Sequence, residues 1–422
     1  MDFFADSVSD GDIGAYISRH SGDSRIKEAY ESYLGTRGIN KGPIPVGRPD
    51  NRANTNLAKY ITDTATGYFM GVPPVYKFSA TAAQRLLTEV FDRSDEQDAD
   101  YRIAEDMSIC GTGYDFVYID GVGDVRIAAL DPRNVFIIRR TDIDETPMAA
   151  VRYWRERNRT VGEIYYPHVT KQFAMKGGSV AITAEMETPF SAPNVQCYRN
   201  NRFCRGDFEA VMDNIDIYNL VLSGATDDLQ SIANAYLVLS GMEKPDEETL
   251  SVLRTERVIG LPSDGGAAYI TKNLNDSAIE NHKKTLRQDI MQISGVPDLA
   301  DECFAGNSSG VALRYKLWGI DQLFKKKAAF MEKGLFERMR RVAEALWATG
   351  AGDLGDVEKC VSIVFTRNMP LDMSENADTA VKLRDIVSRQ TLFEMIEPVT
   401  GVGSAEEEER SCEEVLRSAA GA

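Results

Sequence analysis

The sequence predicts an α+β protein, and two patterns lead to that expectation. Apolar residues recur at steps of three and four from Leu313 to Leu346, which places them on one face of a single long helix. Between Tyr114 and Thr183, short runs with strand-like patterns are separated by turn residues. A chain of 422 residues can bury a sizeable core, and we expect it to divide into more than one folding unit.

The first half of the chain combines helices with many strands. Residues 1–24 are polar and without a clear period, so we expect a mobile arm, or an arm ordered only by a neighbouring subunit. Helices are expected at residues 25–34, 54–70 and 98–107. Strands are expected at residues 114–120, 125–130, 135–138, 149–154, 160–166, 169–174 and 180–183. Together these elements predict a mixed domain of about 200 residues.

The second half begins with a helix predicted at residues 207–222, with Asp207 as its N-cap. It lies in an acidic stretch, because no Lys or Arg occurs between Arg205 and Lys244. A small α/β insert follows, and then a more basic amphipathic helix at residues 276–293. The insert has strands at 235–241, 258–261 and 267–270 and a short helix at 247–254. An acidic loop at 296–307 then precedes the long helix, for which Ser308 or Ser309 is the expected cap. A strand at 361–365 and helices at 374–387, 391–396 and 406–417 complete the chain.

The charge and cysteine content restrict the class of protein. A net charge of −17 disfavours tight DNA binding through phosphate neutralisation, which needs clustered Lys and Arg. An acidic wall would instead suit a conduit that must not hold DNA, although simple solubility explains such a charge more often. Six scattered cysteines suggest neither disulfides nor a metal site and fit a reducing cytoplasm. We expect no signal peptide and no membrane-spanning helix.

The sequence contains no local motif for catalysis, and we expect neither a cofactor nor a metal. The pair Gly111 and Gly113 follows a helix and precedes a strand, which is the wrong order for a dinucleotide fold. His20 and His168 are isolated from other potential ligands. An enzyme whose active site assembles from distant positions nevertheless remains the alternative, because catalytic triads are not local in sequence.

Several segments resemble tailed-phage portal proteins of the siphophage type. The strongest are Ile293-Ser294-Gly295-Val296-Pro297-Asp298 and the run from Phe304 to Leu317, FAGNSSGVALRYKL. Further matches, in the family's order, are residues 51–56, 67–73 and 215–219, Asp227-Asp228-Leu229, Ser388 with Thr391 and Leu392, and the acidic run 406–409. The resemblance extends from about Asn51 to Leu416.

The resemblance implies a portal fold and a division of the chain. The implied parts are an N-terminal arm (1–24), a wing (25–206 and the strand returning within 309–371), a first stem helix (207–232), a clip (233–275), a second stem helix (276–294), a tunnel loop (295–308), a long brace helix (309–371) and a short crown (372–422). It further implies a ring of about twelve copies at one capsid vertex, through which double-stranded DNA enters and leaves.

The resemblance also implies site residues and partners. The loop facing the DNA would contain Val296, Pro297, Asp298, Leu299, Asp301, Glu302 and Asn307. The channel or stem would contain Glu209, Asp213, Asp216, Lys283, Lys284 and Arg287, and the clip would contact its partners through Arg254, Glu256, Arg257 and Asp264. The implied partners are further copies of the chain, the terminase large subunit, a head-tail connector or adaptor, major capsid and scaffolding proteins, and weakly held viral DNA. These assignments place the protein in the virion and, during assembly, in the host cytoplasm.

Overall fold

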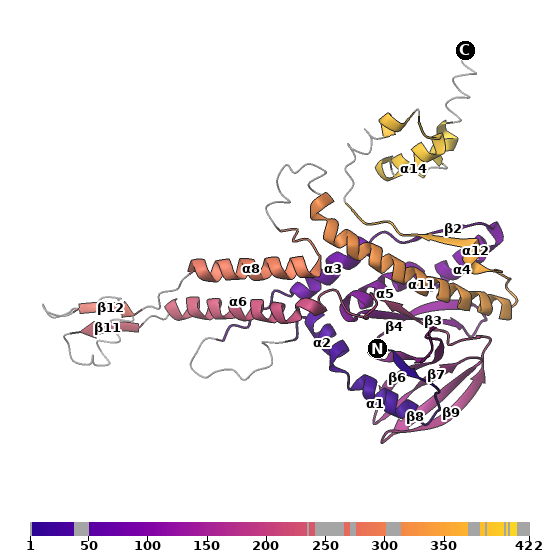
Figure 1. Ribbon diagram of the computed structural model, residues 1–422, viewed down its shortest axis with the longest axis horizontal. Coiled ribbons are helices and arrows are strands. Elements are labelled where there is room, and N and C mark those ends of the chain that lie inside the picture. Colours follow the sequence, from indigo (N-terminus) through magenta and orange to yellow (C-terminus); the bar gives the residue numbers. More distant parts are fainter. Residues whose placement is uncertain are drawn as a thin grey trace, which may run out of the picture. The chain divides into compact units, whose positions relative to one another are not determined.

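The computed structural model describes residues 2–37, 50–233, 236–240, 266–270, 276–300, 314–369, 380–384, 386–400, 402–403 and 406–411 (Figure 1). The chain divides into two compact units, residues 1–367 and 368–422. Helices and strands are both abundant, which confirms the predicted α+β class.

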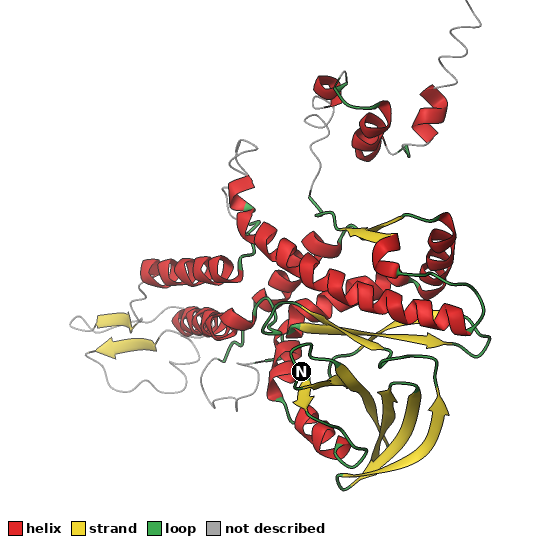
Figure 2. Cartoon of the chain, turned by 45° about the vertical axis from the view of Figure 1, so that its right-hand side comes forward, coloured by secondary structure: helices red, strands yellow, loops and turns green. Residues whose placement is uncertain are grey.

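A six-stranded sheet contains five of the seven strands predicted between Tyr114 and Thr183. Its order is β1 (Phe3–Ala5), β5 (Val135–Arg140), β6 (Pro147–Glu156), β7 (Arg159–Tyr166), β8 (Val169–Lys176) and β9 (Ser179–Glu187). Consecutive strands from β5 to β9 pair antiparallel, whereas β1 pairs parallel to β5. Figure 2 shows the curved strands with a helix at one end.

The N-terminal residues are part of this sheet, so the expectation of a mobile arm is wrong for residues 2–24. Phe3 pairs with Ile138, and α1 (Ile13–Ser21) buries Ile13 and Ile17 completely or almost completely. These side chains pack with Phe136 in one apolar cluster. The polar composition of residues 2–24 gave no sign of this packing, because only the three large apolar side chains Phe3, Ile13 and Ile17 bury this segment against the sheet.

A second layer joins helices to a three-stranded sheet, β10 (Val195–Arg199), β3 (Thr112–Ile119) and β4 (Val125–Leu130). Its helices are α3 (Leu57–Met70), α4 (Thr81–Ser94), α5 (Glu96–Cys110) and the 31-residue α11 (Trp318–Ala348). The largest apolar cluster lies here, and it also receives residues of α12 (Val357–Cys360) and of the pair β13 (Val361–Val364) and β2 (Val75–Phe78).

Helix α11 confirms the predicted apolar stripe. Ile320, Met331, Leu335, Met339 and Val342 are at most 2% exposed and face the rest of the unit. The helix begins at Trp318 after a turn at Leu317, while Leu313, Ser308 and Ser309 lie outside the described residues.

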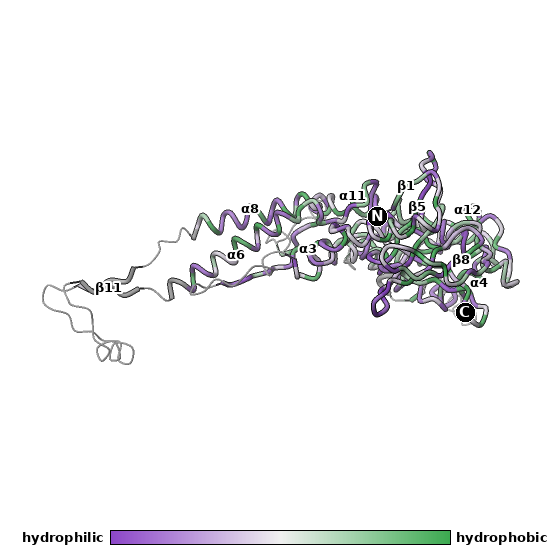
Figure 3. The backbone as a smooth tube through the Cα atoms, turned by 90° about the horizontal axis from the view of Figure 1, so that it is seen from below, coloured by the Kyte–Doolittle hydropathy of each residue, from purple (hydrophilic) through white to green (hydrophobic). Residues whose placement is uncertain are grey.

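Two long helices, α6 (Met212–Ala233) and α8 (Asp276–Ser294), lie side by side (Figures 1 and 3). The second has the predicted bounds to within one residue. The first does not start at Asp207; a 3₁₀ turn, η2 (Glu209–Val211), precedes it, and the Asp207 carboxylate instead contacts Lys327, Ser108 and Asn200. Beyond the two helices, β11 (Tyr236–Ser240) and β12 (Gly266–Ile270) pair antiparallel.

The remaining helices are α2 (Ser24–Tyr33) in the first unit and α14 (Arg389–Thr400) in the second. The predicted strand 258–261 and helix 247–254 lie outside the described residues, as does half of the predicted helix 374–387. Among the described residues, no helix combines the length and the apolar character needed to cross a membrane.

Candidate functional site

The region where α6 and α8 meet the helical layer contains several of the predicted site residues. Ile215 and Tyr218 of α6, Ile290 and Met291 of α8, and Val296 just after α8 are buried in one cluster with side chains of α2 and α3. Residues distant in sequence are therefore fixed relative to one another at the base of the two helices.

An extended segment before α3 runs along α6. The backbone N–H groups of Asn51, Ala53 and Thr55 donate to side chains one helical turn apart: Asp227 Oδ1 (2.7 Å), Ser223 Oγ (3.0 Å) and Asn219 Oδ1 (3.1 Å). Two residues of extended chain span about 6.6 Å and four residues of helix about 6 Å, so the two repeats match. We call residues 51–55 the strap.

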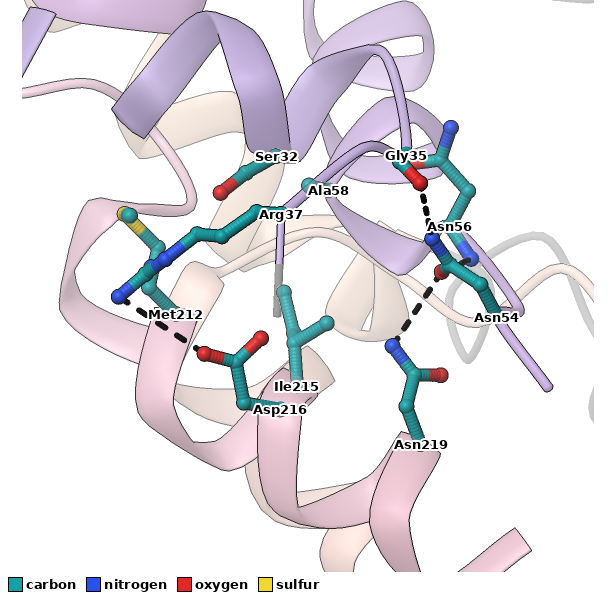
Figure 4. Close-up of a pocket in the computed structure, with 10 residues that line it drawn as sticks. All are labelled: Ser32, Gly35, Arg37, Asn54, Asn56, Ala58, Met212, Ile215, Asp216 and Asn219. Carbon is teal, nitrogen blue, oxygen red and sulfur yellow. Dashed lines mark hydrogen bonds and ion pairs between the residues drawn. The ribbon is translucent and has the colours of Figure 1, made fainter. Parts of the chain in front are cut away.

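A small pocket lies where the strap meets α2 and α6 (Figure 4). Asn54 joins its walls: Nδ2 donates to the Gly35 carbonyl (2.7 Å), and Oδ1 accepts from Asn219 Nδ2 (3.2 Å). The volume of about 10 Å³ admits one water molecule at most, so the pocket is not a ligand site.

The start of the predicted tunnel loop is attached to α3 and α8. Tyr60 of α3 donates its hydroxyl hydrogen to the Pro297 carbonyl (2.9 Å) and accepts from the Leu299 N–H (2.9 Å). Arg287 of α8 pairs with Asp298 through two hydrogen bonds, of which Nη2 to Oδ1 is 2.9 Å long. The hydrogen bonds from Arg287 lower the pKa of the Asp298 carboxyl. This pairing differs from the expectation of an acid free to repel phosphate, because Arg287 offsets the charge of Asp298.

The predicted stem residues have different surroundings. Glu209 has an 8% exposed side chain that pairs with Arg25 (3.3 Å) and Arg205, so it stabilises the turn before α6 and does not face an open channel. In contrast, the Asp213 side chain is 94% exposed, and that of Asp216 is 37% exposed. Arg37 approaches both acids at 3.9 and 3.7 Å.

On α8, Lys283 pairs with Glu280 (2.9 Å), while Lys284 is exposed. The other predicted site residues lie outside the described part of the chain. They are Asp301, Glu302 and Asn307 of the loop, and Arg254, Glu256, Arg257 and Asp264 of the clip.

Buried ion pairs that the sequence analysis missed hold α11 in place. Arg338 is fully buried and pairs with Asp100 (2.6 Å), Asp115 (2.5 Å) and Glu96 (3.3 Å). Nearer the start of the helix, Lys327 Nζ contacts Asp207 Oδ2 (2.6 Å). Both cations occupy positions inside the apolar stripe, and this placement is the only signal that the sequence offered.

The buried ion pairs of Arg338 attach α11 to α5 and β3. Among the described residues, no three His, Cys, Asp or Glu side chains are placed to hold a metal. A hollow of about 500 Å³ beside α11 is rich in Arg, but Arg139, Arg199, Arg340 and Arg341 each pair with a carboxylate and are not arranged to bind an anion. The four described cysteines, Cys110, Cys197, Cys204 and Cys360, are free.

Comparison with known proteins identifies the family. The family model described as "Phage portal protein, SPP1 Gp6-like" matches residues 18–418. The chain belongs to the phage portal protein family. It is also similar to the portal protein of Clostridium phage phiCD119, with 22% identity over 385 residues that cover 84% of this chain and 83% of the relative. The resemblance found in the sequence is therefore confirmed, and the function is that of a phage portal protein, a structural component of the virion.

Portal family membership gives the base of α6 and α8 a functional context. The strap, Tyr60 and Arg287 attach three segments of the portal chain to one another: the residues before α3, the α6 helix, and the chain leaving α8. None of these contacts has a local signature, since each joins residues far apart in sequence or on opposite sides of a helix end.

Proposed function

We propose that about twelve copies of this chain form a ring at one capsid vertex and that double-stranded DNA passes through its centre. The pair α6 and α8 supports this most directly, because two long helices side by side, followed by the β11–β12 pair, provide a wall segment with an extension at one end (Figure 1). Head-to-tail contacts that close by rotation generate such a ring.

In this proposal, the parts keep the division implied by the resemblance. Residues 25–206 with the strand returning after α11 form the wing, α6 and α8 the stem, 233–275 the clip, 295–308 the tunnel loop, α11 the brace helix and 372–422 the crown. The clip receives the terminase large subunit and later a head-tail connector, while the wing and crown contact capsid and scaffolding proteins. The ring assembles in the host cytoplasm and hydrolyses nothing, so the energy for packaging comes from a separate motor.

The loop after α8 narrows the channel, and its root is held by Tyr60 and Arg287. Since Asp298 is paired, repulsion of phosphate falls to the acids further along the loop, Asp301 and Glu302. The DNA is held weakly and without sequence preference, consistent with a net charge of −17.

The mass of the purified protein tests the ring. Twelve copies of a 46.8 kDa chain give a species of about half a megadalton by light scattering, and negative-stain images of that fraction should show rings with a central hole. A protein that stays monomeric at high concentration and with scaffolding protein present would contradict the proposed ring.

A further inference from the structure

The first half of α11 has an exposed stripe that the fold does not use. Its members are Trp318, Gln322, Lys325, Ala329 and Lys333, at successive steps of four, three, four and four residues, and all are exposed. Lys326 lies next to the stripe and is also exposed. The Trp318 side chain is 60% exposed, with Lys325 Nζ 5.8 Å from the centre of its ring.

The cations of this stripe differ from the others on α11. Lys327, Arg338, Arg340 and Arg341 all have carboxylate partners. In contrast, Lys325, Lys326 and Lys333 have no carboxylate partner within the part of the chain that the structure describes. An exposed indole is typical of binding surfaces, and the three lysines make this face cationic in a chain of net charge −17.

Helix α6 has a second stripe with the same spacing and the opposite charge. Asp213, Ile217, Leu220, Gly224 and Asp228 follow one another at steps of four, three, four and four. Ile217 is 45% exposed and Leu220 62%, whereas Ile215 and Tyr218 on the other face are buried. The helix contains no Lys or Arg.

Gly224 leaves an open position at the surface of this stripe. A glycine inside a helix costs about 1 kcal/mol relative to alanine. A Cβ atom at this position would meet nothing within 4 Å, so no neighbour within the described chain explains the glycine. Such a position permits close approach of a bulky side chain from another molecule, and the exposed Trp318 is a side chain of that kind.

We propose that the α11 stripe of one copy packs against the α6 stripe of the next copy in the ring. Both stripes are about 22 Å long, at 1.5 Å per residue, and the acids of one complement the lysines of the other. The indole of Trp318 packs over Gly224, next to the exposed Leu220. Because the two surfaces differ, the contact is head-to-tail, which is the type that closes into a ring. This inference rests on the proposed ring and names the surfaces that form it.

Charge reversal on each stripe, and then on both, tests the contact. The α11 variant is K325E/K326E/K333E, the α6 variant is D213K/D228K, and the third carries all five changes. We expect each of the first two to lower the fraction of protein in the half-megadalton species by about tenfold or more. The combined variant should recover most of the ring, since every interface again pairs opposite charges.

Two further variants separate assembly from folding. Gly224→Gln improves helix propensity, so the subunit should melt no earlier than wild type while the ring is lost. The variant K77E/R85E/K176E changes the charge by the same amount as the α11 variant at exposed positions elsewhere, and its ring should be unaffected.

The possible results distinguish this inference from the proposed function. If wild type forms rings and both reversals leave them intact, or if the combined variant assembles no better than either parent, the contact is wrong although the ring stands. The contact is also wrong if the α11 variant keeps its ring but loses retention of linear double-stranded DNA, since DNA phosphate would then be the partner of the stripe. If wild type forms no ring with scaffolding protein present, the proposed function itself fails.

Discussion

The guanidinium of Arg287 on α8 is hydrogen-bonded through two nitrogens to the carboxylate of Asp298, eleven residues later in the chain. Gly295, between them, has a φ of +73°. This left-handed conformation suits glycine and turns the chain back at the end of α8, so that the acid reaches the helix that it has just left. The pair therefore fixes the direction in which the chain leaves α8.

We expect Arg287→Gln to destabilise the protein by about 1 kcal/mol at neutral pH, since the pair is bidentate but partly exposed. The lowered pKa of Asp298 means that this stabilisation is present above the carboxyl's unfolded pKa, near 3.8, and is lost as the pH falls through the folded value. Urea unfolding at pH 7 and pH 3 should show a larger difference at pH 7 than at pH 3. Lys283→Gln, which breaks an exposed pair on the same helix, should change little, and an equal loss at both pH values would exclude the ionic explanation.

Removing the buried charge of Arg338 should have a much larger effect. Arg338→Met retains the aliphatic volume but leaves Asp100, Asp115 and Glu96 without their shared cation, at an expected cost of about 3 to 5 kcal/mol. Thermal unfolding measures this loss. Arg340→Met, two residues away on the surface, is the control, and similar losses for both variants would mean that the buried network contributes little.

Glu96 should make stability depend on pH. Burial raises its pKa to about 8, so the folded protein holds a proton on this group that the unfolded chain releases above about pH 4.5. The stabilisation is complete below pH 4.5 and declines as the pH rises to about 8. Urea unfolding of wild type and Glu96→Gln at pH 5 and pH 8.5 checks this. The variant should show a smaller decline, and a decline equal to that of wild type would assign the effect to other groups.

The hydrogen bonds of the strap predict that polar side chains of α6 contribute to the free energy of unfolding. Asn219→Ala should cost about 1 to 3 kcal/mol, because the buried amide oxygen accepts from both the N–H and the hydroxyl of Thr55. Asn214→Ala, on the same helix, provides the matched control. Limited proteolysis should cut variant N219A within residues 50–56 faster than wild type, and unchanged cleavage would argue against the strap as a stabilising contact.

Close packing between α11 and β10 gives a further prediction. A Cβ atom at Gly334 would lie 2.4 Å from the ring of Tyr198, so Gly334→Ala should destabilise by about 1 to 3 kcal/mol. Gly67→Ala in α3 meets no atom within 4 Å and should stabilise by up to about 1 kcal/mol. Chemical unfolding of the two variants should therefore give opposite signs. If Gly67→Ala lowers the free energy of unfolding, the low helix propensity of glycine is not what reduces the stability of α3.

Sequence patterns located most elements because those elements repeat locally. The stripe of α11, the bounds of α8 and the alternation of β3 to β9 follow directly from residue spacing. Helix α4 was missed although Ala83, Leu87 and Val90 are buried at helical spacing, because three apolar positions in a polar segment are a weak signal. The N-terminal residues were misassigned for a similar reason, since their burial depends on a sheet more than 130 residues away.

By itself, the sequence determined the α+β class, the acidic character of α6, the more basic character of α8 and the portal family, because periodicity, charge and motif order belong to the chain. Only the tertiary structure decided which charged side chains are paired or buried and which are exposed to solvent. It paired Asp298 with Arg287, buried Glu209 against Arg25, and left Lys325 and Lys333 exposed. The physical reason is that the environment of a charge depends on residues brought together by folding, and a one-dimensional pattern does not contain those contacts.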